Sequence, residues 1–211
     1  GGSGVLDTAS NANTITALTL NSGTVTGTGT LTAATYALVG GVVAGTLGGG
    51  IATVTGSVSL TGMTLADNLN INGGGTLTLG ASERIGALTL VDVNAGELAL
   101  GVNSNTVGAF TLRGSGLLSG IGTLTAATYA LQGGSVNANL GLGVASVTDG
   151  VTLLNGALAA GTVGISSGTL LLGSTISLAA GATLTIGGSG VLDTASNANT
   201  ITALTLNSGT V

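Results

Sequence analysis

The chain repeats part of its own sequence, and this repetition limits the folds that it can adopt. Residues Gly1–Val25 read GGSGVLDTASNANTITALTLNSGTV, and residues Gly187–Val211 carry the same 25 letters, 186 positions later. A second segment, GTLTAATYAL, occurs at Gly29–Leu38 and again at Gly122–Leu131, 93 positions apart. Fixed periods are typical of architectures in which each unit packs only against its neighbours. The sequence therefore predicts a stack of related units.

The two periods predict the domain organisation. Since 186 is twice 93, the chain holds two diverged units and the start of a third. Gly-Thr-Leu or Ser-Gly-Thr segments punctuate each unit about every 20 residues, which is the size of one solenoid coil. The expected divisions are 1–93, 94–186 and 187–211, the last identical in sequence to 1–25, all within one continuous solenoid.

Short alternating segments predict strands. Ala17–Leu20 reads ALTL and Thr76–Leu79 reads TLTL, so each would bury Leu on one side and expose Thr on the other. Gly and Asn separate these segments and accept the backbone angles of sharp corners. Helical periodicity is nearly absent. We therefore expect an all-β protein, a parallel β-solenoid (β-helix) with roughly 20 residues per coil, and a rod on the order of 50 Å long.

Composition supports a narrow β core. Gly supplies 41 residues, charged residues make up 4 % and aromatic residues 1 %, and Pro, Cys and His are absent. The hydrophobic fraction of 44 % argues against intrinsic disorder, and the lack of Pro excludes collagen. Without Cys or His the chain has no disulfide, no thiol chemistry and no imidazole for a metal.

The charge excludes several partners. The formal net charge is −5, and Arg84 and Arg113 are the two basic residues. Such a chain cannot present the basic face that nucleic acids or anionic lipids attract. Mean hydropathy is +0.71, but Gly, Thr, Ser and Asn interrupt every apolar run before the length of about 20 residues that a membrane helix needs. We expect no nucleic-acid partner and no membrane insertion.

Two stretches carry a resemblance to a known class of protein. GTLTAATYALQGGSVNANLG (Gly122–Gly141) and SGVLDTASNANTITALTLNSGTV (Ser3–Val25) resemble the β-strand-repeat regions of filamentous-haemagglutinin-like and autotransporter-type bacterial adhesins. The resemblance extends over essentially the whole chain. It implies an extracellular or cell-surface β-helical protein that serves in adhesion, biofilm matrix or surface fibres. Such repeats share no catalytic residues, so the resemblance assigns none here.

The acidic residues do not form a catalytic pattern. Acid–base catalysis needs paired carboxylates at close range, and the nearest pair in sequence, Asp92 and Glu97, flanks an expected turn at Gly96. We interpret the carboxylates as solvated corner residues, and Glu83 and Arg84 as surface charges that pair with neighbours. We expect no enzymatic activity, no catalytic residue and no cofactor. The acidic residues are Asp7, Asp67, Glu83, Asp92, Glu97, Asp149 and Asp193.

Metal and phosphate motifs are incomplete. GGSGVLD, at Gly1 and Gly187, is close to a calcium-binding nonapeptide, but its Asp falls one position late. NLNINGGG (Asn68–Gly75) lacks the acidic ligands of a calcium loop, so an Asn corner or ladder is expected. No Lys follows Gly48–Gly50, which we interpret as a turn rather than a phosphate loop. We expect no metal site.

Two ligand hypotheses concern specific side chains. Tyr36 and Tyr129 hold equivalent positions and could stack on a sugar, although packing at a coil corner is the favoured interpretation. Alternating Thr residues could form an ice-binding face, but the lattice is broken 93 positions later, at Leu117, Ser119, Ile121, Thr123 and Thr125. The Thr residues concerned are Thr24, Thr26, Thr28, Thr30 and Thr32.

The sequence thus favours a structural function. We expect an extracellular bacterial fibre, matrix or surface-layer component that forms by coil stacking and self-association. Open strand edges and low surface charge both favour association. The alternative is the stalk of a secreted adhesin that carries a separate binding tip, and ice binding is a minor alternative. A surface or glycan ligand is left open.

Overall fold

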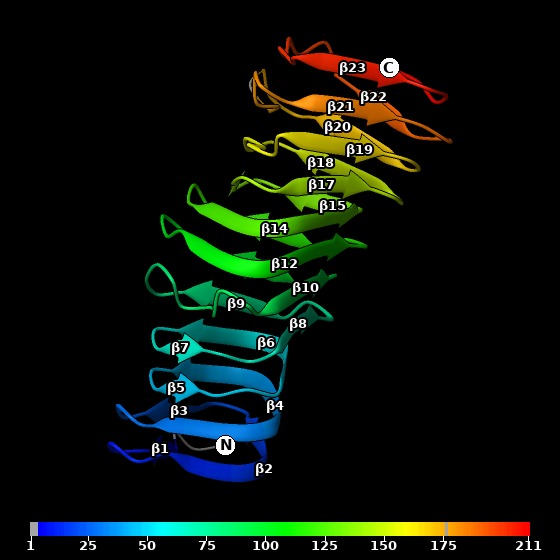
Figure 1. Cartoon of the computed structure of the whole chain (residues 1–211). Helices are drawn as coiled ribbons and strands as arrows, with labels where there is room; N and C mark the ends of the chain where they lie inside the picture. The colour runs from blue at the N-terminus through cyan, green and yellow to red at the C-terminus, as the bar shows by residue number, and fades with distance from the viewer. Residues whose placement is uncertain (1–3, 176) are drawn as a thin grey trace.

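Alternating Leu and Thr form short strands here because one side of each strand is buried while the other meets water. A computed structural model describes residues 4–175 and 177–211. In these residues 23 strands join one parallel sheet, and there is no helix. The chain winds as a parallel β-solenoid of about 11 turns, with about 18 residues per coil. The predicted fold class is confirmed, and the coils stack along one axis between the two termini (Figure 1).

The coils are joined in three ladders, which we call faces 1, 2 and 3; faces 1 and 2 run through every coil, and face 3 is interrupted in some coils. The long strand β4 (Thr30–Val43) belongs to all three. Its first two residues pair with β5 on face 3, Thr35–Leu38 pair with β6 on face 2, and Gly41–Val43 pair with the end of β6 on face 1. Main-chain hydrogen bonds therefore run along the axis on every side of the rod.

The strands divide among the faces as follows. Face 1 contains β1 (Val5–Asp7), β3 (Gly23–Thr26), the ends of β4 and β6 (Ile51–Leu60), β9 (Thr76–Leu79), β11 (Glu97–Ala99), β13 (Leu117–Ser119), β15 (Gly134–Val136), β18 (Val151–Leu154), β20 (Thr169–Leu172) and β22 (Val191–Asp193). Face 2 contains β2 (Asn13–Leu20), the middle of β4, the start of β6, β8 (Asn68–Asn72), β10 (Leu90–Asn94), β12 (Asn105–Arg113), β14 (Thr123–Gln132), β17 (Val144–Val147), β19 (Thr162–Ile165), β21 (Thr183–Ile186) and β23 (Ala203–Leu206). Face 3 contains the starts of β4 and β14, β5 (Thr46–Leu47), β7 (Met63–Thr64), β16 (Asn139–Leu140) and isolated bridges at Ile85, Leu158 and Leu178.

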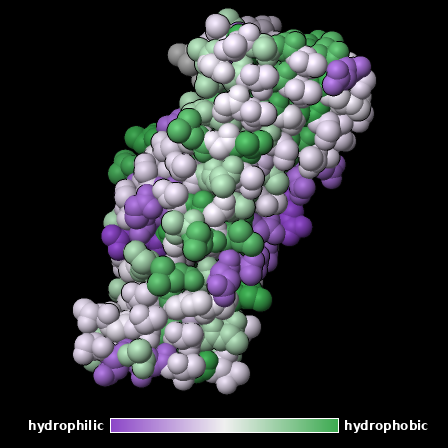
Figure 2. All heavy atoms as spheres, in the orientation of Figure 1, coloured by the Kyte–Doolittle hydropathy of each residue, from purple (hydrophilic) through white to green (hydrophobic). Residues whose placement is uncertain are grey.

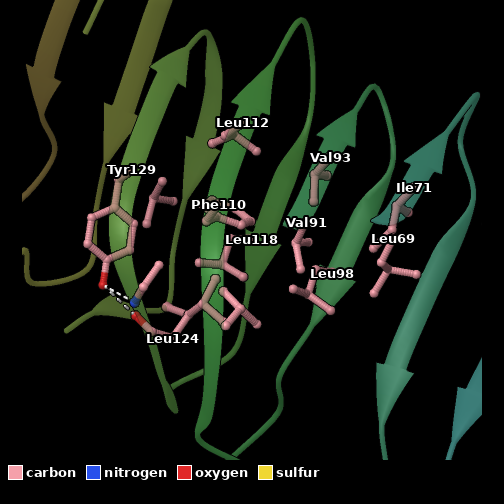
Figure 3. Packing of buried hydrophobic residues seen from close by; sticks show 14 of the residues in the cluster. Leu69, Ile71, Val91, Val93, Leu98, Phe110, Leu112, Leu118, Leu124 and Tyr129 are labelled. Atoms are coloured by element: carbon pink, nitrogen blue, oxygen red, sulfur yellow. Dashed lines mark hydrogen bonds between the residues drawn. The ribbon is translucent and has the colours of Figure 1, made fainter. Parts of the chain in front are cut away.

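The core consists of columns of side chains that run parallel to the axis. Figure 3 shows neighbouring coils of face 2 that contribute apolar residues at matching heights. Full burial of one Leu or Val stabilises the fold by about 1.5–3 kcal/mol, so the columns supply the main apolar contribution. One column of face 2 contains Leu18, Tyr36, Ala52, Leu69, Val91, Phe110, Tyr129, Ala145, Val163, Leu184 and Leu204.

Close coil contacts require glycine at two positions that are 93 residues apart. A Cβ atom on Gly29 would lie 2.0 Å from the carbonyl oxygen of Asn11, and one on Gly122 would lie 1.8 Å from that of Asn103. Each glycine opens a copy of the repeated segment GTLTAATYAL. The repeat therefore preserves a corner at which one coil turns directly over the preceding one.

The expected unit divisions do not interrupt the sheet. The division between 93 and 94 lies inside β10, and the division between 186 and 187 follows the last residue of β21. Parallel pairing continues on either side of both positions. Within the described residues there is also no helix with the length and apolar character needed to cross a membrane.

Candidate functional site

The two tyrosines are core residues. Tyr36 and Tyr129 are each 1 % exposed. The hydroxyl of Tyr129 accepts a hydrogen bond from the N–H of Ala126 at 2.9 Å and donates one to the carbonyl of Leu124 at 3.0 Å (Figure 3). Burial raises the pKa of both phenols, although the N–H of each corner opposes the shift. The packing interpretation is confirmed, and a sugar cannot stack on rings that are enclosed in this way.

The same arrangement recurs one repeat earlier. The hydroxyl of Tyr36 accepts from the N–H of Ala33 at 2.8 Å and donates to the carbonyl of Leu31 at 2.9 Å. Each ring thus fills the core beneath the corner between faces 3 and 2, and its hydroxyl bonds to backbone groups of that corner. This contact explains why a chain with so few aromatic residues has Tyr at two equivalent positions.

The nearest pair of carboxylates in sequence is separated by a corner of the solenoid. Asp92 lies on face 2, in β10, where it forms an ion pair with Arg113 and accepts from its Nε at 3.0 Å. Glu97 lies on face 1, in β11, and accepts from the hydroxyl of Ser119 at 2.5 Å. The two carboxylates face different sides of the rod, so they cannot act on one substrate group together.

Asp7 and Asp193 occupy matching turns in the two identical segments. The Asp7 carboxylate accepts from the N–H of Ala9 at 2.7 Å, and the Asp193 carboxylate accepts from that of Ala195 at 2.8 Å. Ala9 and Ala195 both have a φ of 48°, so the identical sequence produces the same local turn in both places. In the described residues no group of three or more acidic side chains is placed to hold a metal ion.

The other acidic side chains also bond to the backbone. Their carboxylates accept hydrogen bonds from backbone N–H groups at or near coil corners. The sequence alone did not predict these contacts. Asp67 accepts from Gly50 at 2.8 Å, Glu83 from Thr106 at 3.1 Å, and Asp149 from Gly150 at 2.8 Å.

Arg84 differs from the expected surface ion pair. It is partly buried, and in the described structure its Nε atom has no hydrogen-bond partner. Its neighbour Glu83 is exposed and bonds to Thr106 of the next coil instead. The salt bridge found among the described residues joins Arg113 to Asp92.

The alternating threonines do not form one flat array. Thr24 and Thr26 belong to β3 on face 1, whereas Thr30 lies on face 3 at the start of β4. Thr28 lies in the turn between them, and its hydroxyl donates to the carbonyl of Ala9 at 3.1 Å. The pattern therefore wraps around a corner, and an ice lattice would meet only part of it.

The two remaining glycine-rich motifs are corners. Asn68–Asn72 form strand β8, and Gly73 and Gly74 follow it with φ angles of 59° and 82°. Gly48–Gly50 connect β5 to β6, with Gly50 at a φ of 115°. Asn72 lies in register with Asn94 of the next coil, and elsewhere on the rod the Asn155 amide donates to the side-chain oxygen of Asn137 at 2.8 Å.

Two apolar surfaces were missed by the sequence analysis. Leu65 and Leu88 project from the corner between faces 3 and 2 and border a shallow depression, with Leu88 89 % exposed. A second hollow lies in the N-terminal coil and is bordered by Leu6, Leu18 and Leu20. The period-two pattern identifies inward and outward residues within strands, but it does not describe corners or hollows.

Figure 2 shows the chemistry of one lateral surface. Pale atoms of intermediate hydropathy cover most of it, and the strongly apolar and strongly polar residues occur as separate patches. The charged residues in the whole chain amount to 4 %. On this surface, weakly polar groups separate the stronger patches from one another.

The geometry defines a class of protein, the parallel β-solenoids, here with a core made mostly of Leu, Val and Ile side chains. Searches of protein-family models, of curated proteins and of solved structures found no match to the chain.

Proposed function

We propose that the chain is a structural component of an extracellular bacterial fibre, matrix or surface layer, in which coil stacking forms the rod and self-association forms the assembly. The observation that carries this proposal is the unbroken parallel ladder from β1 and β2 to β22 and β23. The bacterial, extracellular setting rests on the resemblance of the repeats to those of surface adhesins.

The direction of the hydrogen bonds supports a mechanical role. Neighbouring coils are joined by main-chain hydrogen bonds on faces 1 and 2 and, in many coils, on face 3 as well. A force along the rod would be shared among many of these hydrogen bonds at once, and the packed apolar columns would also resist it. Such an arrangement resists extension and local unravelling better than a few side-chain contacts would.

The sides of the rod support lateral association. Rods with few charges repel one another weakly, so their small side chains can approach closely. Exposed Leu65 and Leu88 offer apolar contacts at one corner, and Leu142, 74 % exposed, projects from the turn that precedes β17. These positions suggest where neighbouring rods would meet.

The stalk of an adhesin is a second candidate because a straight solenoid can also hold a separate tip away from a cell. Electron microscopy of the native material distinguishes the two. Continuous filaments with an axial spacing of about 4.8 Å would support the fibre. Isolated surface spikes with a distinct terminal knob would favour the stalk, and dispersed single rods at high concentration would contradict the fibre proposal.

A further inference from the structure

The chain contains two Asn-Gly pairs, Asn72–Gly73 at the end of β8 and Asn155–Gly156 directly after β18. Asn is a thermolabile residue, because the backbone nitrogen of the residue that follows can attack its side-chain carbonyl carbon. Glycine leaves that nitrogen unshielded, since it has no side chain. The two pairs share this chemistry, so a difference in their reactivity must come from the fold.

The pair Asn155–Gly156 is held between two coils. Gly156 is buried, and its N–H donates to the carbonyl of Val136 at 3.1 Å. A Cβ atom on Gly156 would lie 1.8 Å from the carbonyl oxygen of Ala138, so the preceding coil leaves this backbone little room to turn. The Asn155 amide donates to the side-chain oxygen of Asn137 at 2.8 Å. Both groups that would have to react are therefore fixed in place.

The pair Asn72–Gly73 lies in an open turn. Gly73 and Gly74 are exposed, and a Cβ atom on either would meet nothing within 4 Å. Their φ angles are 59° and 82°, and the N–H of Gly75 donates to the carbonyl of Asn72 at 2.9 Å to close the turn. Within residues 4–175 and 177–211, the Gly73 N–H and the Asn72 carboxamide make no hydrogen bond to the chain. The nitrogen and the side-chain carbon can therefore approach each other when this exposed turn opens locally.

We propose that Asn72–Gly73 is a self-modification site, at which the Asn72 carboxamide becomes a carboxylate in the folded rod while Asn155 is protected. The Gly73 nitrogen bonds to Cγ of Asn72, the bond from Cγ to Nδ2 breaks, and Nδ2 leaves as ammonia with the proton that Gly73 gives up. Water then adds to either carbonyl of the cyclic succinimide, which opens to aspartate or to isoaspartate. The reaction consumes water alone, so it is independent of the fibre proposed above.

The surroundings of Asn72 can accept both products. Asn72 is the last residue of β8 and follows the buried Leu69 and Ile71, so the part of the strand that packs the core precedes the modified residue. Asn94 lies in register with Asn72 on the next coil, where its amide can donate to a new carboxylate. Isoaspartate adds a carbon to the main chain, and the open turn has room for it. Each event adds a negative charge to a chain of net charge −5, so older rods repel one another more strongly.

Peptide mapping by mass spectrometry tests the contrast within one molecule. The folded chain is incubated in warm, mildly alkaline buffer, which favours the nucleophilic form of the Gly73 nitrogen, and the acid product is quantified at residues 72 and 155 over time. We expect conversion of Asn72 to be at least several-fold faster than that of Asn155. An isoaspartyl methyltransferase with a labelled methyl donor detects the isoaspartate. N72Q should lose most of the label, because Gln cyclises more slowly, whereas the matched variant N155Q should keep it.

The same chain in concentrated guanidinium chloride is the control for the fold. Both pairs are free once the coils are gone, so we expect similar rates at the two residues there. Similar rates in the folded chain, whose circular dichroism must be unchanged after incubation, would overturn the proposal. It would also be overturned if Asn72 reacted only after unfolding, or if N72Q kept the label.

Discussion

The hydroxyl of Tyr129 lies 2.9 Å from the backbone nitrogen of Ala126, three residues earlier in the chain. This contact links a core side chain to the corner at which face 3 becomes face 2. The phenol combines two roles there, because its ring fills the column while its hydroxyl accepts from the N–H of Ala126 and donates to the carbonyl of Leu124.

The first prediction removes that hydroxyl. In Tyr129→Phe the N–H of Ala126 and the carbonyl of Leu124 lose their shared partner inside the core, so we expect the free energy of unfolding to fall by about 1–3 kcal/mol. Urea unfolding monitored by circular dichroism measures the change. Tyr36→Phe should behave similarly, because its hydroxyl makes equivalent bonds. Unchanged unfolding midpoints in both variants would show that the bonds contribute little.

The second prediction concerns alkaline pH. Burial raises the pKa of Tyr36 and Tyr129 above the ordinary value of 10.0, so the unfolded chain loses these protons first as the pH rises. Stability should hold up to about pH 9 and fall as the pH passes 10, until the folded phenols also ionise. Because the chain has no Cys and no Lys, few other groups titrate in this window.

Denaturant midpoints between pH 8 and pH 11 test this expectation. The double variant Tyr36→Phe/Tyr129→Phe serves as the control, and its midpoint should stay nearly constant across the same range. A wild-type curve as flat as that of the control would contradict the prediction.

The third prediction uses two glycines in different surroundings. A methyl group on Gly122 would lie 1.8 Å from the carbonyl oxygen of Asn103, so Gly122→Ala must push two coils apart and should strongly destabilise the rod. A methyl group on Gly164, in β19, meets nothing within 4 Å, and Gly164→Ala should stabilise by about 0.5–1 kcal/mol through the unfolded chain. Thermal unfolding of both variants measures the contrast, and equal effects would contradict it.

The fourth prediction compares two leucines in one column. Leu131 is fully buried in β14, whereas Leu206, in β23, is 52 % exposed. Leu131→Ala should destabilise by about 2–5 kcal/mol because it leaves a cavity between well-packed coils. Leu206→Ala should have a clearly smaller effect, because about half of that side chain already contacts water. Similar losses of unfolding free energy in the two variants would contradict the prediction that burial in this column determines the effect.

Much of the fold could be predicted from the sequence because its main determinants are local and repeated. Alternating residues such as those of Thr76–Leu79 defined strands with one buried side, and the structure has β9 there. The expected coil of roughly 20 residues is close to the length of about 18 that the structure has. The register of the coils follows from contacts such as Gly122 over Asn103, which involve residues 19 positions apart and leave no local pattern.

The face of the rod on which each side chain lies was harder to predict from the sequence. Thr24 and Thr30 share one alternating run in the sequence, but a corner assigns them to different faces. The same effect separates Asp92 from Glu97. An alternating pattern tells which residues point inward, and it does not tell where the backbone changes direction between them.

The columns of the core give the rod one more property. Leu, Val and Ile replace one another freely from coil to coil, as in the column that passes through Val93, Leu112, Leu131 and Val147. A gene duplication or deletion that adds or removes a whole turn therefore leaves the cross-section intact and alters length alone. The length of the rod then changes in increments of about 4.8 Å per coil.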